Sequence, residues 1–213
     1  MRNVLQKIDA YYTASLSAHG PTPRGVDWNS AESQSLRFDR LATAIPQTGP
    51  VTVLDYGCGY GAFCEFLANY NPSARYVGYD VSDAMIAAAQ KIHGDRVEFT
   101  SDSSTLQPAG VVVASGIFNV RMDVTPAAWE AYIFETLERI ALLAKEAFAF
   151  NMLTIYSDAE YMRGDLYYGD PHVFFDWCQK RYGRWVATLH DYGLYEFTTI
   201  ARKAPARSEP AFR

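Results

Sequence analysis

The 213-residue sequence has few of the features that would place it in a membrane, outside the cell or on a metal ion. It has no run of about 18 apolar residues, so no transmembrane span is expected. The N-terminal segment interrupts its apolar pattern with charged residues, unlike a signal peptide. Three cysteines without CxxC spacing are typical of a reduced, cytoplasmic protein. No group of His, Asp or Glu has the spacing of a metal site.

Positive charge is also scarce, since the formal net charge is −5 and no stretch forms a basic patch. Proteins that grip a phosphate backbone usually carry such a patch, so no nucleic-acid partner is expected. Hydrophobic residues make up 49% and charged residues 20%, which is typical of a globular chain rather than a disordered one. The length fits one domain with a substantial core.

The order of the predicted elements indicates an α/β fold. Residues 1–45 are predicted to form an N-terminal helical cap, with helices over 3–18 and 31–44. From residue 51, strands alternate with helices, and two last strands flank the Tyr192-Gly193 turn. The predicted strands cover 51–57, 74–81, 96–101, 111–120 and 146–153, and the helices cover 62–70, 83–91, 125–144 and 172–182. We expect a Rossmann-like three-layer sandwich around a mostly parallel seven-stranded sheet with an antiparallel C-terminal hairpin strand.

A glycine-rich turn, LDYGCGYGAF, follows the first strand of this pattern and carries Gly57, Gly59 and Gly61. Glycine lets a ligand approach the backbone, and the carboxyl edge of an open α/β sheet is where ligands bind. Asp80 ends the second strand, where a carboxylate can accept both hydroxyls of a ribose. The sequence therefore predicts a nucleoside site.

Two classes of nucleoside ligand share this arrangement, and the spacing favours one of them. Dinucleotide enzymes use GxGxxG, whereas this turn reads GxGxG. Asp55, two residues before the first glycine, would repel a pyrophosphate but suits the ammonium group of an amino-acid ligand. The pattern favours S-adenosylmethionine over NAD, which stays as the outside alternative.

The segments VLDYGCGYG, GYDVSDAMI and FTSDS resemble the successive cofactor motifs of the class I S-adenosylmethionine-dependent methyltransferases. The resemblance covers about residues 30–200 and implies a role for each matching residue. The methionine part of the cofactor would meet Asp55, Gly57 and Gly59, with Gly61 in the same turn, and Asp80 would bind the ribose. The adenine would lie by Val81, Met85, Asp102 and Ser103, and the sulfonium by Ser115 and Gly116 in the fourth strand.

The acceptor side of the site is less well specified, because methyl transfer depends mainly on alignment and needs a base only for some acceptors. Asn119 could orient an acceptor, and Arg121 could hold an anionic one. His190 could act as a base oriented by Asp191, or both residues could only make turn hydrogen bonds. Trp28 and Tyr12 could be substrate contacts of the cap or hydrophobic anchors, and we expect part of the pocket from the aromatic insertion near 156–175. Residues 204–213 are interpreted as a tail.

These patterns predict a methyltransferase that uses S-adenosylmethionine and methylates a small-molecule acceptor, on oxygen before nitrogen. Protein or RNA methylation is the alternative within enzymes, although no basic groove supports it. A non-catalytic cofactor-binding protein of the same fold is the alternative outside enzymes. We expect a cytoplasmic monomer or homodimer with no metal ion, no nucleic-acid partner and no membrane association.

Overall fold

Seven strands form one mixed sheet in the computed structural model, which describes residues 2–203. The strand order is β3-β2-β1-β4-β5-β7-β6, in which the first five strands run parallel and β7 is antiparallel to both of its neighbours. The strands are β1 Val51–Tyr56, β2 Ala74–Tyr79, β3 Glu98–Thr100, β4 Ala109–Ala114, β5 Ala144–Leu153, β6 Val186–Leu189 and β7 Glu196–Arg202. The predicted mostly parallel sheet with a C-terminal antiparallel hairpin is confirmed.

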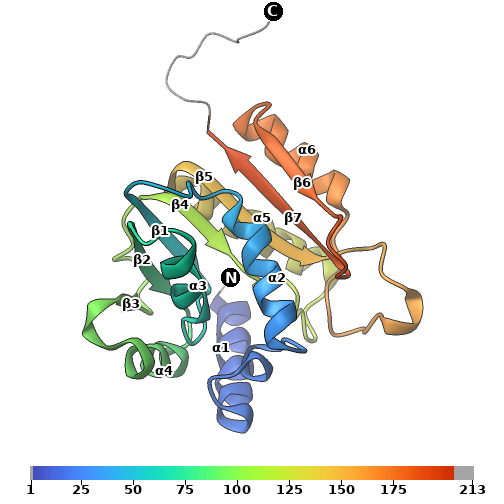
Figure 1. Ribbon diagram of the computed structural model, residues 1–213. Coiled ribbons are helices and arrows are strands. Elements are labelled where there is room, and N and C mark those ends of the chain that lie inside the picture. Colours follow the sequence, from blue (N-terminus) through green and yellow to red (C-terminus); the bar gives the residue numbers. More distant parts are fainter. Residues whose placement is uncertain (1, 204–213) are drawn as a thin grey trace, which may run out of the picture.

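Helices cover both faces of the sheet (Figure 1). Helices α2 Ala31–Ala42, α3 Ala62–Tyr70 and α4 Asp83–His93 pack on one face, where Phe38, Phe63 and Ile86 share a core cluster with strand residues. Helices α5 Pro126–Leu143 and α6 Pro171–Tyr182 pack on the other face. The remaining helices are α1 Arg2–His19 and three 3-10 turns, η1 Pro23–Val26, η2 Gly94–Arg96 and η3 Ala159–Tyr161. No helix in the described residues 2–203 is long and apolar enough to cross a bilayer.

Local sequence signals fix where several of these helices begin. Ser30 forms a capping box with Ser33, and the hydroxyl of Ser82 accepts a hydrogen bond from the Met85 amide. Thr125 and Asp170 are each the N-cap of a helix, and in both cases proline follows as the first helical residue. Proline is tolerated there because the N–H group that it lacks would have no partner within the helix. The predicted starts of these four helices are confirmed within one or two residues.

The fourth strand is shorter than the sequence suggests. A strand over 111–120 was expected from its continuous apolar run, but β4 ends at Ala114. Gly116 takes a φ of +68°, which turns the backbone out of the sheet, and the indole N–H of Trp129 donates to the carbonyl of Phe118. The apolar residues after position 114 are therefore buried by loop packing. Ser115 and Gly116 follow the strand rather than lying in it.

The connection between β3 and β4 spans residues 101–108 and contains no helix. Parallel strands are usually joined by a helical crossover, which would cover one sheet face. Here a short loop makes the connection instead, and the guanidinium of Arg139 on α5 donates to the Ser103 carbonyl. The face that carries Tyr56 and Tyr79 therefore stays open toward α5.

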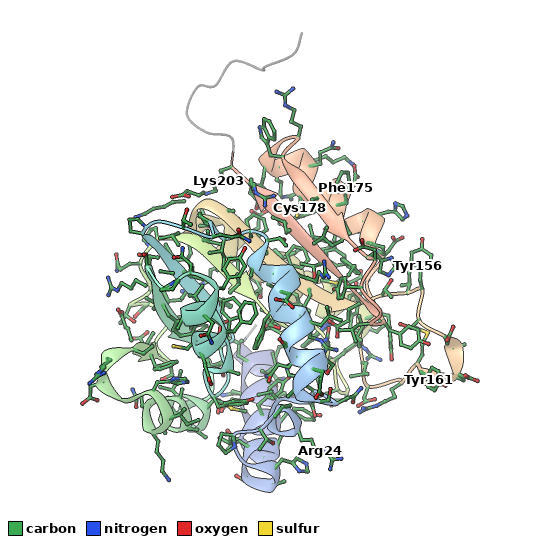
Figure 2. The ribbon with its side chains drawn as sticks, in the orientation of Figure 1. Arg24, Tyr156, Tyr161, Phe175, Cys178 and Lys203 are labelled. Atoms are coloured by element: carbon green, nitrogen blue, oxygen red, sulfur yellow. The ribbon has the colours of Figure 1, made fainter. Side chains whose placement is uncertain are left out.

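Helix α1 and the segment between β5 and α6 differ in how closely they are held to the body of the molecule. Helix α1 is attached by a hydrogen bond between Thr13 and Ser82 and by an ion pair between Lys7 and Asp123. The segment between β5 and α6 instead projects away from the body of the molecule, and it carries the exposed residues Tyr156 and Tyr161 (Figures 1 and 2). The predicted tail, 204–213, lies outside the described residues.

Candidate functional site

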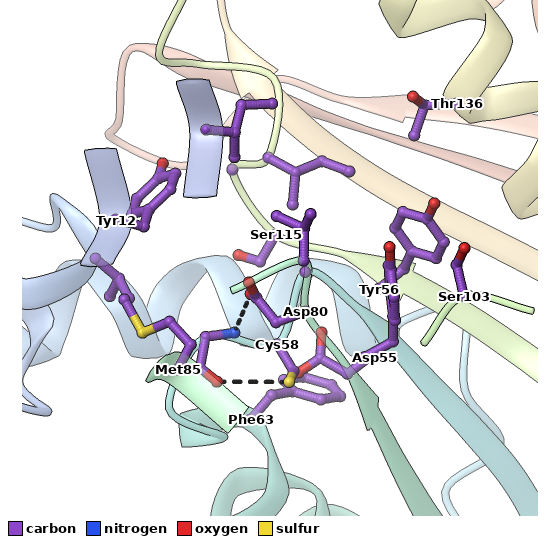
Figure 3. Close-up of a pocket in the computed structure, with 18 of the residues that line it drawn as sticks. Tyr12, Asp55, Tyr56, Cys58, Phe63, Asp80, Met85, Ser103, Ser115 and Thr136 are labelled. Carbon is purple, nitrogen blue, oxygen red and sulfur yellow. Dashed lines mark hydrogen bonds between the residues drawn. The ribbon is translucent and has the colours of Figure 1, made fainter. Parts of the chain in front are cut away.

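A cavity of about 390 Å³ lies at the carboxyl edge of the sheet and follows the turn after β1. Binding sites for small ligands commonly enclose about 300–1,000 Å³. The cavity walls come from helices α1 to α5, the loop after η1, the ends of β1 and β2, and the turns after β3 and β4. Figure 3 shows Tyr12 and Met85 on one side of this space and Tyr56, Ser103 and Thr136 on the other.

The glycine turn is fixed in position by backbone hydrogen bonds to the end of β2. The amides of Gly57 and Cys58 both donate to the carbonyl of Tyr79, at 2.7 and 2.9 Å. Gly57 has a φ of +87°, and a Cβ atom there would lie 2.2 Å from Ile117 Cγ2. A side chain at position 57 would clash with the turn after β4, so the two turns can approach only because this residue is glycine.

Asp80 joins the glycine turn to the start of α4. One carboxylate oxygen accepts from the Gly59 amide at 2.8 Å (Figure 3), and the other accepts from the Ser82 amide at 2.9 Å. Burial raises the pKa of Asp80, while these two backbone donors oppose the rise. The carboxylate is thus oriented by the protein before any ligand arrives.

Asp55 is the most deeply buried acid of the cavity wall, with 2% of its surface exposed. Its carboxylate accepts from the hydroxyl of Tyr76 at 2.8 Å. Burial raises the pKa of Asp55 to about 7, the tyrosine hydroxyl opposes the rise, and the nearby Asp80 adds to it. A cationic ligand group beside Asp55 would favour the charged carboxylate.

Most of the residues predicted to bind the cofactor line this one cavity. They are Asp55, Gly57, Gly59, Asp80, Val81, Met85, Ser103, Ser115 and Gly116. Gly61 lies outside the lining, because it is the N-cap of α3 and faces His93 and Phe99. Asp102 also lies outside: it is exposed, and its carboxylate accepts from the amide and the hydroxyl of Ser104.

Similarity to known proteins identifies the family. A family model described as a methyltransferase domain matches residues 54–146. The protein Rv1506c of Mycobacterium tuberculosis, whose name is that of a methyltransferase, is 46% identical over 157 residues, which cover 73% of this chain and 95% of the relative. The chain belongs to the class I S-adenosylmethionine-dependent methyltransferases. This methyltransferase uses S-adenosylmethionine as its methyl donor.

Two further comparisons are more distant. The malonyl-[acyl-carrier protein] O-methyltransferase of Legionella pneumophila is 32% identical over 129 residues, which cover 59% of this chain but only 44% of that protein. The solved structure of the DhpI–SAH complex has a TM-score of 0.63 and 16% identity, and the match covers 96% of this chain and 99% of that one. At that identity the likeness shows the shared fold.

The cavity of the methyltransferase fits the donor in two observable ways. The hydroxyl oxygen of Ser115 is buried and has no hydrogen-bond partner among the described residues, so a ligand could supply one. The carboxyl groups of Asp55 and Asp80 suit a ligand that carries an ammonium, a sulfonium and ribose hydroxyls.

The structure separates the predicted acceptor residues into two groups. Tyr12 and Trp28 line the cavity. Asn119 is buried elsewhere, and its side-chain oxygen accepts from the Leu153 amide. The guanidinium of Arg121 donates to the carbonyls of Val124 and Gly164, so it braces loops instead of facing the cavity.

His190 and Asp191 also lie apart from the cavity. Both residues are exposed after β6, and the imidazole of His190 packs near the rings of Tyr156 and Phe197. No residue of the segment 156–175 lines the cavity either. The contribution to the acceptor pocket that was expected from this segment is therefore not seen.

Several cavity residues escaped the sequence prediction, above all a group of tyrosines. Tyr56 and Tyr79 stand opposite each other on β1 and β2, and Tyr132 faces them from α5. Alternation along a strand offered a signal, because Asp55 points to one sheet face and Tyr56 must then point to the other. Their place in the cavity depends on the lack of a helix between β3 and β4, where none was predicted, and on the packing of α5, which the sequence pattern does not reveal.

Proposed function

We propose that this methyltransferase transfers the methyl group of S-adenosylmethionine to an oxygen atom of a small-molecule acceptor that enters beside Tyr12 and Trp28. The observation that carries the proposal is that these two residues share one cavity with nine of the predicted cofactor residues. A shared cavity lets the protein align the two reactants, and alignment is the main requirement of a direct displacement.

The residues of the cavity would divide the donor among them. S-adenosylmethionine supplies the methyl group on a positively charged sulfur, which is already a strong electrophile. The turn from Gly57 to Gly59 and Asp55 would hold its amino-acid part, and Asp80 would hold the ribose. Ser115 and Gly116 would border the sulfur, and Val81, Met85 and Ser103 would enclose the adenine.

The size of the cavity supports a small acceptor. A volume of about 390 Å³ must hold the donor and the reacting part of the acceptor together. Helix α1 and the loop that carries Trp28 close one side of it, which leaves little room for a folded protein or an RNA helix at the reacting atoms. These walls favour a molecule that enters wholly or by a narrow end.

The side chains around the cavity support oxygen ahead of nitrogen as the acceptor atom. No histidine is among the described residues that line it, the carboxylates of Asp55 and Asp80 already accept hydrogen bonds, and the other two acids of the lining, Glu135 and Glu138, are exposed on α5. Burial raises the pKa of the Tyr12 phenol well above its usual range, so its hydroxyl stays a hydrogen-bond donor. An oxygen that is ionised at neutral pH, such as a carboxylate or an acidic phenol, needs no base, whereas an ammonium does.

A two-stage experiment tests the proposal. Calorimetric titration with S-adenosylhomocysteine should give one binding site per chain, and absence of binding would overturn the donor assignment. The protein is then incubated with radiolabelled S-adenosylmethionine and matched sets of carboxylic acids, phenols and amines. Label transfer to acids or phenols is expected. Transfer to amines alone would contradict the oxygen assignment, and transfer only to added protein or RNA would contradict the small acceptor.

A further inference from the structure

A buried ion pair lies directly behind the wall of the cavity. Arg37 on α2 and Glu196 at the start of β7 are 6% and 1% exposed. The guanidinium donates through Nε to both carboxylate oxygens at 2.9 Å and through Nη2 to Oε1 at 2.6 Å. Its Nη1 donates to the Ser33 carbonyl, so each of the three guanidinium nitrogens has a partner.

On one side the pair connects to the turn after β4. The amide nitrogen of the Asn151 side chain donates to Glu196 Oε2 at 3.0 Å, and its oxygen accepts from the Gly116 backbone amide at 2.7 Å. Asn151 is fully buried on β5. The backbone position of Gly116, a cavity residue, is therefore tied to Glu196 through a single side chain.

On the other side the pair connects to Trp28. The guanidinium carbon of Arg37 lies 4.0 Å from the centre of the indole ring, within the range of a cation–π contact. The far edge of the same ring covers Gly116, where a Cβ atom would lie 2.2 Å from Trp28 Cη2. Glu196, Arg37, Trp28, Gly116 and Asn151 thus form a closed circuit of contacts.

Stability alone does not explain such a circuit. A buried ion pair can often be replaced by apolar residues without loss of stability, because burying the charges costs about as much as their attraction returns. Its better-attested effect is to select one arrangement among several, since a guanidinium and a carboxylate match in few orientations. Here the arrangement that is selected holds the indole over Gly116.

We propose that Arg37 and Glu196 are positioning residues, which act through Trp28 to fix the wall of the cavity at the end where the methyl group leaves. The proposal rests on the proposed function, because Gly116 is taken to border the sulfur. With the pair intact, Trp28 is ordered before ligands bind and limits the width available to an acceptor. Without it, the indole loses its backing and the donor must order it on binding.

The test removes both charges together, since a single substitution would strand a buried charge and could unfold the protein. The variant Arg37→Gln/Glu196→Gln is compared with Trp28→Phe, with the combination of all three changes, and with the wild type. The matched control is Arg75→Gln/Glu98→Gln, which removes an exposed ion pair of similar length between β2 and β3. Affinity for S-adenosylhomocysteine is measured by calorimetry, and indole accessibility by acrylamide quenching without ligand.

We expect the double variant to bind S-adenosylhomocysteine about three- to tenfold more weakly, the range for one large side chain that must be ordered by the ligand. Quenching should rise, and the rise should vanish when Trp28→Phe is also present. The loss of affinity should also vanish in that background, whereas the control pair should change neither quantity.

An equal loss of affinity with and without Trp28 would overturn the proposal, because the pair would then act by another route. Unchanged quenching with lowered thermal stability would also overturn it and leave a structural role. If the wild type binds no S-adenosylhomocysteine, the proposed function fails. Quenching without ligand still decides whether the pair positions Trp28.

Discussion

The two ends of the cavity are built in different ways. At the donor end, Gly57, Gly59 and Asp80 come from consecutive elements of the chain, and their contacts follow from the order of strand, turn and strand. At the opposite wall, Trp28 and Gly116 meet only because α2, β5 and β7 are already packed. The first end is encoded by a short motif, whereas the second depends on the completed fold.

The difference indicates where each end should be sensitive to change. Substitution of an acid at the donor end removes contacts with the ligand and should leave folding largely intact. Substitutions at the Trp28 wall disturb packed atoms and should act on stability and binding together. The five predictions below test this contrast, beginning with the largest expected effect.

Gly116→Ala should be the most damaging of these changes. The added Cβ would meet the Trp28 ring at 2.2 Å, and the residue has a φ of +68°. Overpacking and the positive φ together should lower the free energy of unfolding by roughly 2–4 kcal/mol. Chemical denaturation measures this loss, and titration with S-adenosylhomocysteine should show weaker binding.

Gly20→Ala is the control for this change. Gly20 has nearly the same φ, +67°, with no atom within 4 Å of the added Cβ. It should show only the part of the loss that comes from backbone strain. Equal losses at the two positions would mean that contact with Trp28 contributes nothing.

Asp80→Ala should weaken binding of S-adenosylhomocysteine with a smaller effect on folding. Leaving buried polar groups unpaired costs roughly 1–3 kcal/mol, or about 5- to 150-fold in affinity. Asp102→Ala is the comparison, since that exposed acid lies outside the cavity and should leave affinity unchanged. A loss at Asp102 equal to that at Asp80 would show that the site extends farther along the loop than its walls indicate.

Binding of S-adenosylmethionine should depend on pH through Asp55. Its pKa of about 7 means that the carboxyl group takes up a proton as pH falls below 7 and loses its attraction for a cation. Affinity should fall by about tenfold between pH 8 and pH 6, a change that the linkage of one proton permits. Calorimetry at several pH values measures the slope, and Asp55→Asn should flatten it.

The same shift makes a prediction about stability. The folded-state pKa of Asp55 lies above its ordinary value of 3.8, so between pH 3.8 and 7 the folded protein holds a proton that the unfolded chain has lost. The free energy of unfolding therefore falls as pH rises from 3.8 to 7. Asp55→Asn should therefore be more stable than the wild type at pH 8 while binding the donor less well. A variant that is less stable at pH 8 would contradict the burial cost.

His190→Ala should have the smallest effect. The imidazole is exposed and lies outside the cavity, so turnover with any acceptor found in the screen should stay within about twofold of the wild type, as for most exposed positions. Tyr12→Phe serves as the contrast, because its hydroxyl belongs to a cavity residue and its loss should lower turnover. A large loss at His190 would restore it as the base.

Most of the fold and the donor end of the site could be predicted from the sequence. Alternating apolar runs gave the parallel strands, and the glycine turn followed by Asp80 predicted their meeting point, because strand ends in a parallel sheet share one edge. Asp102 lies outside the cavity for a local reason, since one of its carboxylate oxygens accepts from the amide and the hydroxyl of Ser104 within its own loop. A motif match cannot tell which acceptor a carboxylate finds.

The wall formed by Trp28 and Gly116 could not be predicted to the same depth. Arg37 stands on the buried face of its helix, beside Phe38 and Leu41, which hints at a buried partner. Nothing in the pattern identifies that partner as Glu196, 159 positions away. The absence of a helix between β3 and β4 likewise opens a tyrosine-lined face that only the packed structure reveals.

The contact between Trp28 and Gly116 also has a consequence for how the family's sequences vary. The indole of Trp28 occupies the space that a side chain at position 116 would need, so a change at one position limits what the other can accept. The two positions are coupled in this way although most of the cofactor motif separates them in the chain. Among relatives, a larger residue at 116 should appear only with a smaller one at 28, and loss of Arg37 should accompany loss of Glu196. Paired changes of this kind would trace, across the family, which members keep the narrow wall and which have opened it to bulkier acceptors.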